Sequence, residues 1–248
     1  MRRISPKGLV ITVDLSKISG SENPRTVEAP LHSDFQEPFV IEWGDGTRSV
    51  VDSFTQFPAH TYGGTETVYR ITVRSLNGRL PNVRAYASNR NITAALVSVD
   101  YFNGSTGNSQ TLNNINCCFQ NCGNVKYVDP RLCGQWNLGN LASWFQTSGL
   151  SQPVESFCFD FCESVSTISG LFSGSKITGT IQPGMFDNCK AVTSVKNAFK
   201  GCSYLPPPPY LFWEKDFPAL TETTDCYAGC SWAMREQVPT DYGGIMTT

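Results

Sequence analysis

The sequence Pro183-Gly184-Met185-Phe186-Asp187-Asn188-Cys189 decides the fold, together with the closely related Ala198-Phe199-Lys200-Gly201-Cys202 that follows it. From these two segments outward, an aromatic residue or a leucine returns at nearly regular intervals. We term these positions the beats: Phe119, Leu132, Phe145, Phe159, Phe172, Phe186, Phe199, Phe212 and Tyr227. A Cys or Ser often follows shortly after a beat, as Cys189 follows Phe186. So regular a pattern from Cys117 to Cys230 indicates a repeat architecture.

The beats come in two alternating kinds. One kind follows a proline, as at Pro130, Pro183 and Pro209, and the other does not. The spacing between beats of the second kind gives a repeating unit of about 27 residues, within the range of leucine-rich-type repeats. Each unit is predicted to form one coil whose apolar residues pack against the next coil. The residues expected in this core are Phe119, Phe145, Phe172, Phe186 and Phe199, with the small residues Cys122, Cys189 and Cys202 allowing the chain to turn.

The segment from Pro183 to Leu205 resembles BspA-like leucine-rich repeats, and so does the closing sequence Val238–Gly244. The resemblance covers roughly the range 115–244. It implies binding or display rather than catalysis, because proteins of this type are surface adhesins of gut and oral bacteria. Similar arrays occur in proteins carried on bacteriophage particles. The run Pro206–Pro209 departs from the pattern; we expect a stiff turn there, with a docking edge as the alternative.

The N-terminal part of the chain, residues 1–78, follows a different pattern. Short alternating segments at 9–15, 39–43, 48–54 and 68–73 predict strands of a small antiparallel β-sandwich. Ile41–Thr47, His60-Thr61-Tyr62 and Tyr69–Val73 resemble the PKD-type immunoglobulin-like module, whose signature is W-G-D-G-T, H-x-Y and Y-x-V-x-V. The resemblance implies structural roles. Trp43 would pack in the core and Asp45 and Gly46 would shape the turn, with His60 and Tyr62 in the second motif.

These patterns predict a mostly β protein with an N-terminal immunoglobulin-like sandwich and a C-terminal leucine-rich-repeat solenoid. The expected division is residues 1–78 for the sandwich, 79–116 for a transition and cap, and 117–248 for the repeats. Within the transition, Val83–Tyr86 and Ala95–Val99 are predicted to be strands, and Tyr101–Gly104 a first, degenerate repeat. The fraction of charged residues is 16% and the formal net charge is −2, so no overall basic field attracts nucleic acid. No apolar run is long enough for a transmembrane helix.

Ten cysteines raise the question of disulfides. Most of them lie at repeat positions among apolar residues, where a free cysteine behaves as a small hydrophobic residue. We therefore expect a reduced, stacked column of thiols. Disulfides are the alternative, at pairs such as Cys118/Cys122, Cys158/Cys162 and Cys226/Cys230.

Residues for catalysis are few. His60 belongs to the structural motif, and His32 lies in a proline-flanked loop near Asp34. No nucleophile, metal or phosphate-binding motif is present, so we predict no catalytic residue, no metal site and no cofactor. Acidic residues form two groups along the sequence: Glu155, Asp160 and Glu163, and Asp216, Glu222 and Asp225. We prefer to interpret them as scattered, solvated carboxylates. The alternative is that either group binds a cation or a sugar.

Aromatic residues between the beats are the candidates for binding, since a ring there suits a glycan or a protein contact. Packing against a neighbouring coil is the equally weighted alternative. The candidates are Trp136, Tyr210, Trp213 and Trp232.

The functional expectation is a non-enzymatic bacteriophage virion protein: a capsid decoration, head fibre or tail-associated adhesin. With no signal peptide apparent after Met1, we expect synthesis in the host cytoplasm. Expected partners are other virion proteins, a second copy of the chain, and a host-surface glycan or protein, without nucleic acid or membrane insertion. The module order predicts that the sandwich anchors the protein and the repeats face outward. The alternative is a bacterial cell-surface adhesin.

Overall fold

A computed structural model describes residues 8–31, 38–52, 57–76, 83–86, 90–103, 117–134, 139–157, 159, 162–207, 212–214, 216–233 and 238–244. Over these residues the protein is mostly β, with one large mixed sheet and little helix, which confirms the prediction at that level. The strands are β1 (Gly8–Asp14), β2 (Thr26–Glu28), β3 (Phe39–Glu42), β4 (Arg48–Val51), β5 (Ala59–Thr61), β6 (Val68–Ser75), β7 (Leu96–Asn103) and β8 (Tyr127–Val128). The helices are α1 (Asn91–Ala95), α2 (Arg131–Gly134) and the 3-10 turns η1 (Leu15–Lys17), η2 (Val154–Ser156), η3 (Phe212–Glu214) and η4 (Thr240–Tyr242).

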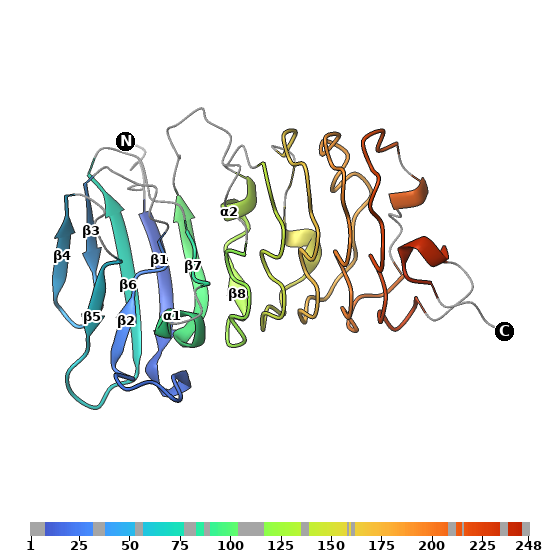
Figure 1. Ribbon diagram of the computed structural model, residues 1–248. Helices are drawn as coiled ribbons and strands as arrows, with labels where there is room; N and C mark the ends of the chain where they lie inside the picture. Colours follow the sequence, from blue (N-terminus) through green and yellow to red (C-terminus); the bar gives the residue numbers. More distant parts are fainter. Residues whose placement is uncertain are drawn as a thin grey trace.

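The large sheet has six strands in the order β4-β3-β6-β1-β7-β8 (Figure 1). All neighbouring pairs are antiparallel except β7 and β8, which are parallel. The strands predicted within the range 1–78 are thus confirmed, but the sheet extends beyond that range, because β1 pairs with β6 on one edge and with β7 on the other. Of the predicted degenerate first repeat at Tyr101–Gly104, Tyr101–Asn103 end β7, which pairs in parallel with β8, and Gly104 lies outside the described residues.

Alternation along the strands places the core on one face of the large sheet. Every second residue of β1, beginning with Leu9, Ile11 and Val13, is almost fully buried. The two-stranded sheet of β2 and β5 contributes Val27 to the same core. Around Val83, the predicted strand forms only a single bridge, to Leu31. None of the described helices is long and apolar enough to cross a membrane.

Beyond β8, the backbone forms a ladder with a nearly constant offset. Phe145 donates its N–H to Leu171 O, Phe172 to Ala198 O and Phe199 to Cys226 O, all over 2.8 Å. In each case the acceptor lies about one repeat length further along the chain. Parallel bridges join Thr167 to Ser194 and Ser194 to Glu222. Consecutive segments therefore lie side by side up to the region of the C-terminus (Figure 1).

A side chain joins the large sheet to this ladder. The amide of Gln152 accepts from the N–H of Val128 over 2.6 Å and donates to its C=O over 3.0 Å, as a paired strand would. On its other side the same segment pairs with the next one, where Thr178 donates to Gln152 O and Val154 donates to Thr178 O. Nearby, buried Asp129 accepts from the N–H of Phe102 at the end of β7. The sheet and the ladder are thus hydrogen-bonded to each other.

Candidate functional site

The pair of residues that most resembles a reactive site is Asp45, in the turn after β3, and His60, on β5. Asp45 Oδ2 lies 2.7 Å from His60 Nε2, while Asp45 Oδ1 accepts from the N–H and the hydroxyl of Thr47. Burial alone would raise the pKa of Asp45, but the hydrogen bonds from Thr47 and His60 outweigh it and lower that pKa to about 2. Both oxygens of Asp45 are therefore occupied, Oδ1 within its own turn, as expected for an aspartate that shapes a turn, and Oδ2 by His60 on β5.

The residues around this turn have packing contacts. Trp43 is buried, stacks on His60 with ring centroids 5.2 Å apart, and donates its Nε1–H to Ser49. Tyr62 donates its hydroxyl to the carbonyl of Trp43 over 2.9 Å. Gly46 has a φ of +88°, which L-residues rarely adopt. A hollow of about 460 Å³ beside Asp45 opens between the turn at Gly63 and Gly64 and the residues Glu66 and Tyr69.

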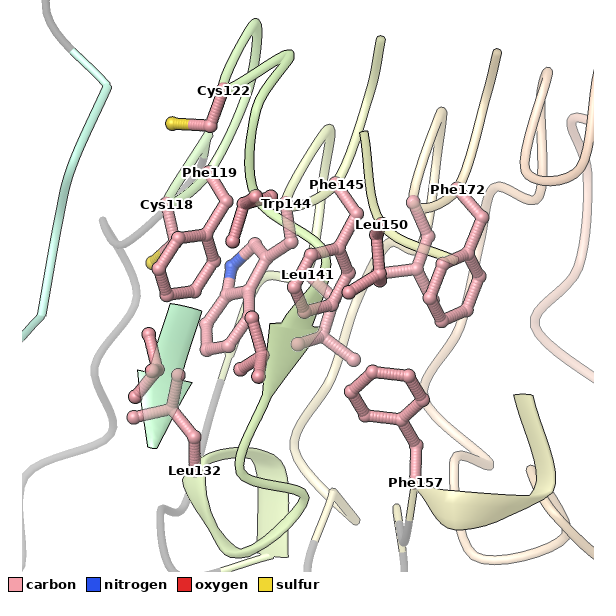
Figure 2. Packing of buried hydrophobic residues seen from close by; sticks show 14 of the residues in the cluster. Cys118, Phe119, Cys122, Leu132, Leu141, Trp144, Phe145, Leu150, Phe157 and Phe172 are labelled. Atoms are coloured by element: carbon pink, nitrogen blue, oxygen red, sulfur yellow. The ribbon is translucent and has the colours of Figure 1, made fainter. Parts of the chain in front are cut away.

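The beats form two columns of stacked rings in the repeat interior. The rings of Phe119, Phe145, Phe172, Phe199 and Tyr227 follow one another with centroids 5.4 to 5.7 Å apart. Figure 2 shows Phe119, Phe145 and Phe172 projecting in the same way from successive segments, above Phe157. The second column includes Phe159 and Phe186, 5.0 Å apart. All of these rings are almost fully buried, in agreement with the core residues expected from the sequence.

The cysteines of the repeats are buried thiols. Cys122, Cys189, Cys202, Cys226 and Cys230 are free and buried, and Cys117 is free and partly exposed. The thiols of Cys202 and Cys230 donate to the carbonyls of Phe172 and Phe199 in the preceding segment, over 3.0 and 3.1 Å. Burial raises the pKa of Cys122, Cys202 and Cys230 to about 12. A thiol that stays protonated is a poor nucleophile, so these cysteines serve packing; Cys189 is likewise buried.

The repeats also contain a backbone feature that the sequence analysis missed. Positions just before and just after each non-proline beat adopt positive φ, for example Ser143 and Thr147 around Phe145. The full set is Cys117, Asn121, Ser143, Thr147, Gly170, Gly174, Asn197, Gly201, Asp225 and Gly229. Gly, Asn and Asp tolerate this conformation best, so their recurrence at these positions was the available signal.

The predicted binding aromatics fall into two groups. Trp136 and Tyr210 lie outside the described residues. Trp213 is partly buried against the core, with its ring 5.0 Å from Tyr242. Trp232 is only 8% exposed and its ring lies 5.1 Å from Tyr227. The sequence left packing and ligand binding as equal alternatives. For Trp213 and Trp232, the contacts in the structure are packing contacts.

The acidic residues do not converge among the described part of the chain. No group of three or more metal-binding side chains occurs there. Glu155 accepts from the N–H of Thr180 in the next segment, over 2.9 Å. Asp225 pairs with Lys200 over 2.7 Å, and a hydrogen bond from Thr224 lowers the pKa of Glu222. His32, Asp34 and Asp160 lie outside the described residues.

The arrangement best suited to binding is a column of exposed hydroxyls that the sequence analysis also missed. Ser166, Thr193 and Thr221 occupy the same position relative to the beat that follows them, and all three are exposed. Their hydroxyls donate to the carbonyls of Gly139, Ser166 and Thr193 in the preceding segments, over 3.0, 3.0 and 3.3 Å. We term this set the hydroxyl column. Because each hydroxyl proton is donated to the preceding segment, the lone pairs of the hydroxyl oxygen are left to accept hydrogen bonds.

Charged and polar groups border the hydroxyl column. Ser169 and Ser194 bond to each other over 2.6 Å on adjacent segments. Lys196 is exposed beside them, and Glu222 follows Thr221 directly. The face therefore offers acceptors at each segment, with a cation and an anion nearby. Such a set can hydrogen-bond an extended polar ligand along the ladder, and its described residues include no group positioned for covalent chemistry.

In comparisons with known proteins, no family model, no curated protein and no solved structure matches this chain.

Proposed function

We propose that this chain is a non-enzymatic structural protein in which a PKD-like β-sandwich carries a leucine-rich-repeat solenoid that attaches to a host surface. The observation that carries the proposal is the regular backbone ladder with its exposed hydroxyl column. A rigid ladder repeats the same acceptor groups at the spacing of paired strands. That regularity suits an extended glycan, or a protein surface, better than a small substrate.

The state of the candidate reactive groups supports a binding role. Asp45, in the turn after β3, and His60, on β5, are bonded to each other, and burial keeps the thiols of Cys202 and Cys230 protonated. A binding protein needs no activated group. It needs a surface that holds its shape, and stacked rings beneath the column provide that rigidity.

A bacteriophage virion is the location that we propose, with a bacterial cell-surface adhesin as the alternative. The free thiols of Cys122, Cys189, Cys202, Cys226 and Cys230 favour the virion, because structural disulfides form and persist mainly in secreted proteins while cytoplasmic assembly keeps thiols reduced. Other virion proteins of the capsid or tail would then be partners. In this proposal the sandwich anchors the chain and the repeats face the host.

The location is tested by purifying phage particles from a host that expresses the gene and imaging them by cryo-electron microscopy. We expect the chain in ordered copies on the particle. Recovery of the chain from the bacterial envelope, with none on particles, would support the adhesin instead.

Ligand binding is tested by applying the purified chain to a glycan array and to host cells. We expect binding that the double variant Thr193→Val, Thr221→Val reduces, because valine keeps the shape but removes the acceptors. The matched control is Thr61→Val, an exposed threonine on β5 that also bonds a neighbouring hydroxyl. Equal binding by both variants would exclude the hydroxyl column as the binding surface.

A further inference from the structure

The strand β4 ends the six-stranded sheet, and no strand within the described part of the chain pairs with its outer edge. It pairs with β3 on one side, with Val50 opposite Val40 and Arg48 opposite Glu42. It is the outermost strand of the sheet, at the end of the molecule away from the repeats (Figure 1). An unpaired edge presents backbone donors and acceptors that can pair with another strand.

The register identifies which backbone groups are available. Trp43 donates its N–H to Thr47 O, so these two residues form a hydrogen-bonded pair of the hairpin. Hydrogen-bonded pairs alternate along an antiparallel ladder. Ser49 and Val51 therefore point their backbone groups toward β3, and Arg48 and Val50 point theirs outward.

The side chains along this edge are self-complementary. Arg48 and Val50 are exposed on one face of β4, with Val50 at 57% exposure, and Asp52, in the bend directly after the strand, is exposed as well. Among the residues that the structure describes, neither Arg48 nor Asp52 has a partner for its charge. The order cation, valine, anion is complementary to itself when a second copy of the strand runs in the opposite direction.

We propose that two copies of this chain pair through β4, antiparallel, about a two-fold axis at Val50. In that register Val50 lies opposite the partner's Val50, and Arg48 lies opposite the partner's Asp52. The outward backbone groups of Val50 then meet in a hydrogen-bonded pair, and the large sheets of both copies become one continuous sheet. A shift of the register that set Arg48 opposite the partner's Val50 would lose both charge pairs.

The proposed interface has favourable contributions of known kinds. Opposite charges and apolar pairs across antiparallel strands are stabilising, and like charges directly opposite are destabilising. The symmetry doubles the charge pairs, because each occurs twice in a two-fold interface. The inference rests on the β4 edge alone and does not depend on the proposed attachment function.

The test is sedimentation velocity of the full chain over a wide concentration range. We expect a reversible dimer in the wild type. Arg48→Glu and Asp52→Arg should each weaken it, by about ten-fold or more in dissociation constant, because each sets like charges opposite one another. The double variant Arg48→Glu, Asp52→Arg should restore the dimer, since the pair is only exchanged.

A matched pair of lysine variants separates the edge from the rest of the sheet. Val50→Lys should give a monomer, because two lysines would meet on the axis. Val68→Lys should leave the dimer unchanged, since Val68 is also 57% exposed but lies on β6 opposite Asp14. Circular dichroism of each variant shows that it is folded.

Three results would overturn the proposal. One is a wild-type chain that stays monomeric at all concentrations, even if its β4 edge binds an extended peptide instead. Another is a dimer that Val50→Lys leaves intact. The third is a folded double-exchange variant that stays as weak as the single variants.

Discussion

The large sheet and the repeat ladder pair their backbones in two different ways. In the sheet, β1 pairs with β6 and β7, at sequence separations that differ from one pair to the next. In the ladder, each segment pairs with the segment about one repeat length later. Pairing in the sheet therefore has no fixed sequence offset, whereas pairing in the ladder follows the recurrence of the same residue types at the same positions.

Removing one ring from a beat column should have the largest effect. Phe172 is fully buried, with centroids 5.4 Å from Phe145 and 5.7 Å from Phe199. Phe172→Ala should lower the free energy of unfolding by about 3–5 kcal/mol, as for other large-to-small core substitutions. Urea unfolding followed by tryptophan fluorescence measures it. Tyr204→Ala, in the same region but 62% exposed, should change it by less than about 0.5 kcal/mol.

The turn after β3 gives the corresponding test in the sheet. Gly44 and Gly46 have φ values of +89° and +88°. Gly46→Ala should cost about 1–2 kcal/mol, for the left-handed backbone alone. Gly44→Ala should cost about 1–3 kcal/mol more, because its Cβ would lie 2.6 Å from the carbonyl oxygen of Arg70, whereas nothing lies within 4 Å at Gly46. Equal losses in thermal unfolding experiments would contradict the close contact.

The sequence predicted interiors better than surfaces, for a physical reason. Burial imposes an apolar residue at fixed intervals, so Phe145 or Ile71 is recognisable by its spacing. The left-handed positions are filled by Cys, Ser, Thr, Asn, Asp or Gly, and so varied a set obscures the rule. The hydroxyl column was missed because Ser and Thr are common in loops, and only the ladder reveals that Ser166 and Thr193 are aligned.

The extent of the large sheet was the main structural feature that the sequence did not predict. Alternation predicts a strand but not its neighbour, and nothing in Leu96–Asn103 shows that β1 is its partner. The hydrogen bonds from Gln152 to Val128 could not be predicted either, because no sequence pattern marks a buried glutamine side chain that takes the place of a backbone partner.

A substitution at Gln152 tests how much this join contributes to stability. Gln152→Met keeps the approximate shape but leaves the N–H and C=O of Val128 without their partner. The free energy of unfolding should fall by about 1–3 kcal/mol, the cost of unsatisfied buried polar groups. Gln182→Met is the control, since Gln182 is exposed and makes one long bond to Thr180 O. Hydrogen exchange should show faster exchange at Val128 in the Gln152 variant, and unchanged exchange there would argue against the join.

The smallest effect on the free energy of unfolding is expected from acid, through Asp45 in the large-sheet region. The folded-state pKa of Asp45 is about 2, below its ordinary value of 3.8. A carboxylate whose pKa is lowered by folding stabilises the protein above its ordinary pKa, and that contribution is lost as the pH falls toward the folded-state value. The free energy of unfolding should therefore fall more between pH 4 and pH 2 in the wild type than in Asp45→Asn, where residue 45 no longer titrates. Because other carboxylates titrate in both proteins, the difference between the two urea-unfolding series isolates Asp45. Parallel series would mean that the bonds from Thr47 and His60 do not favour the charged form.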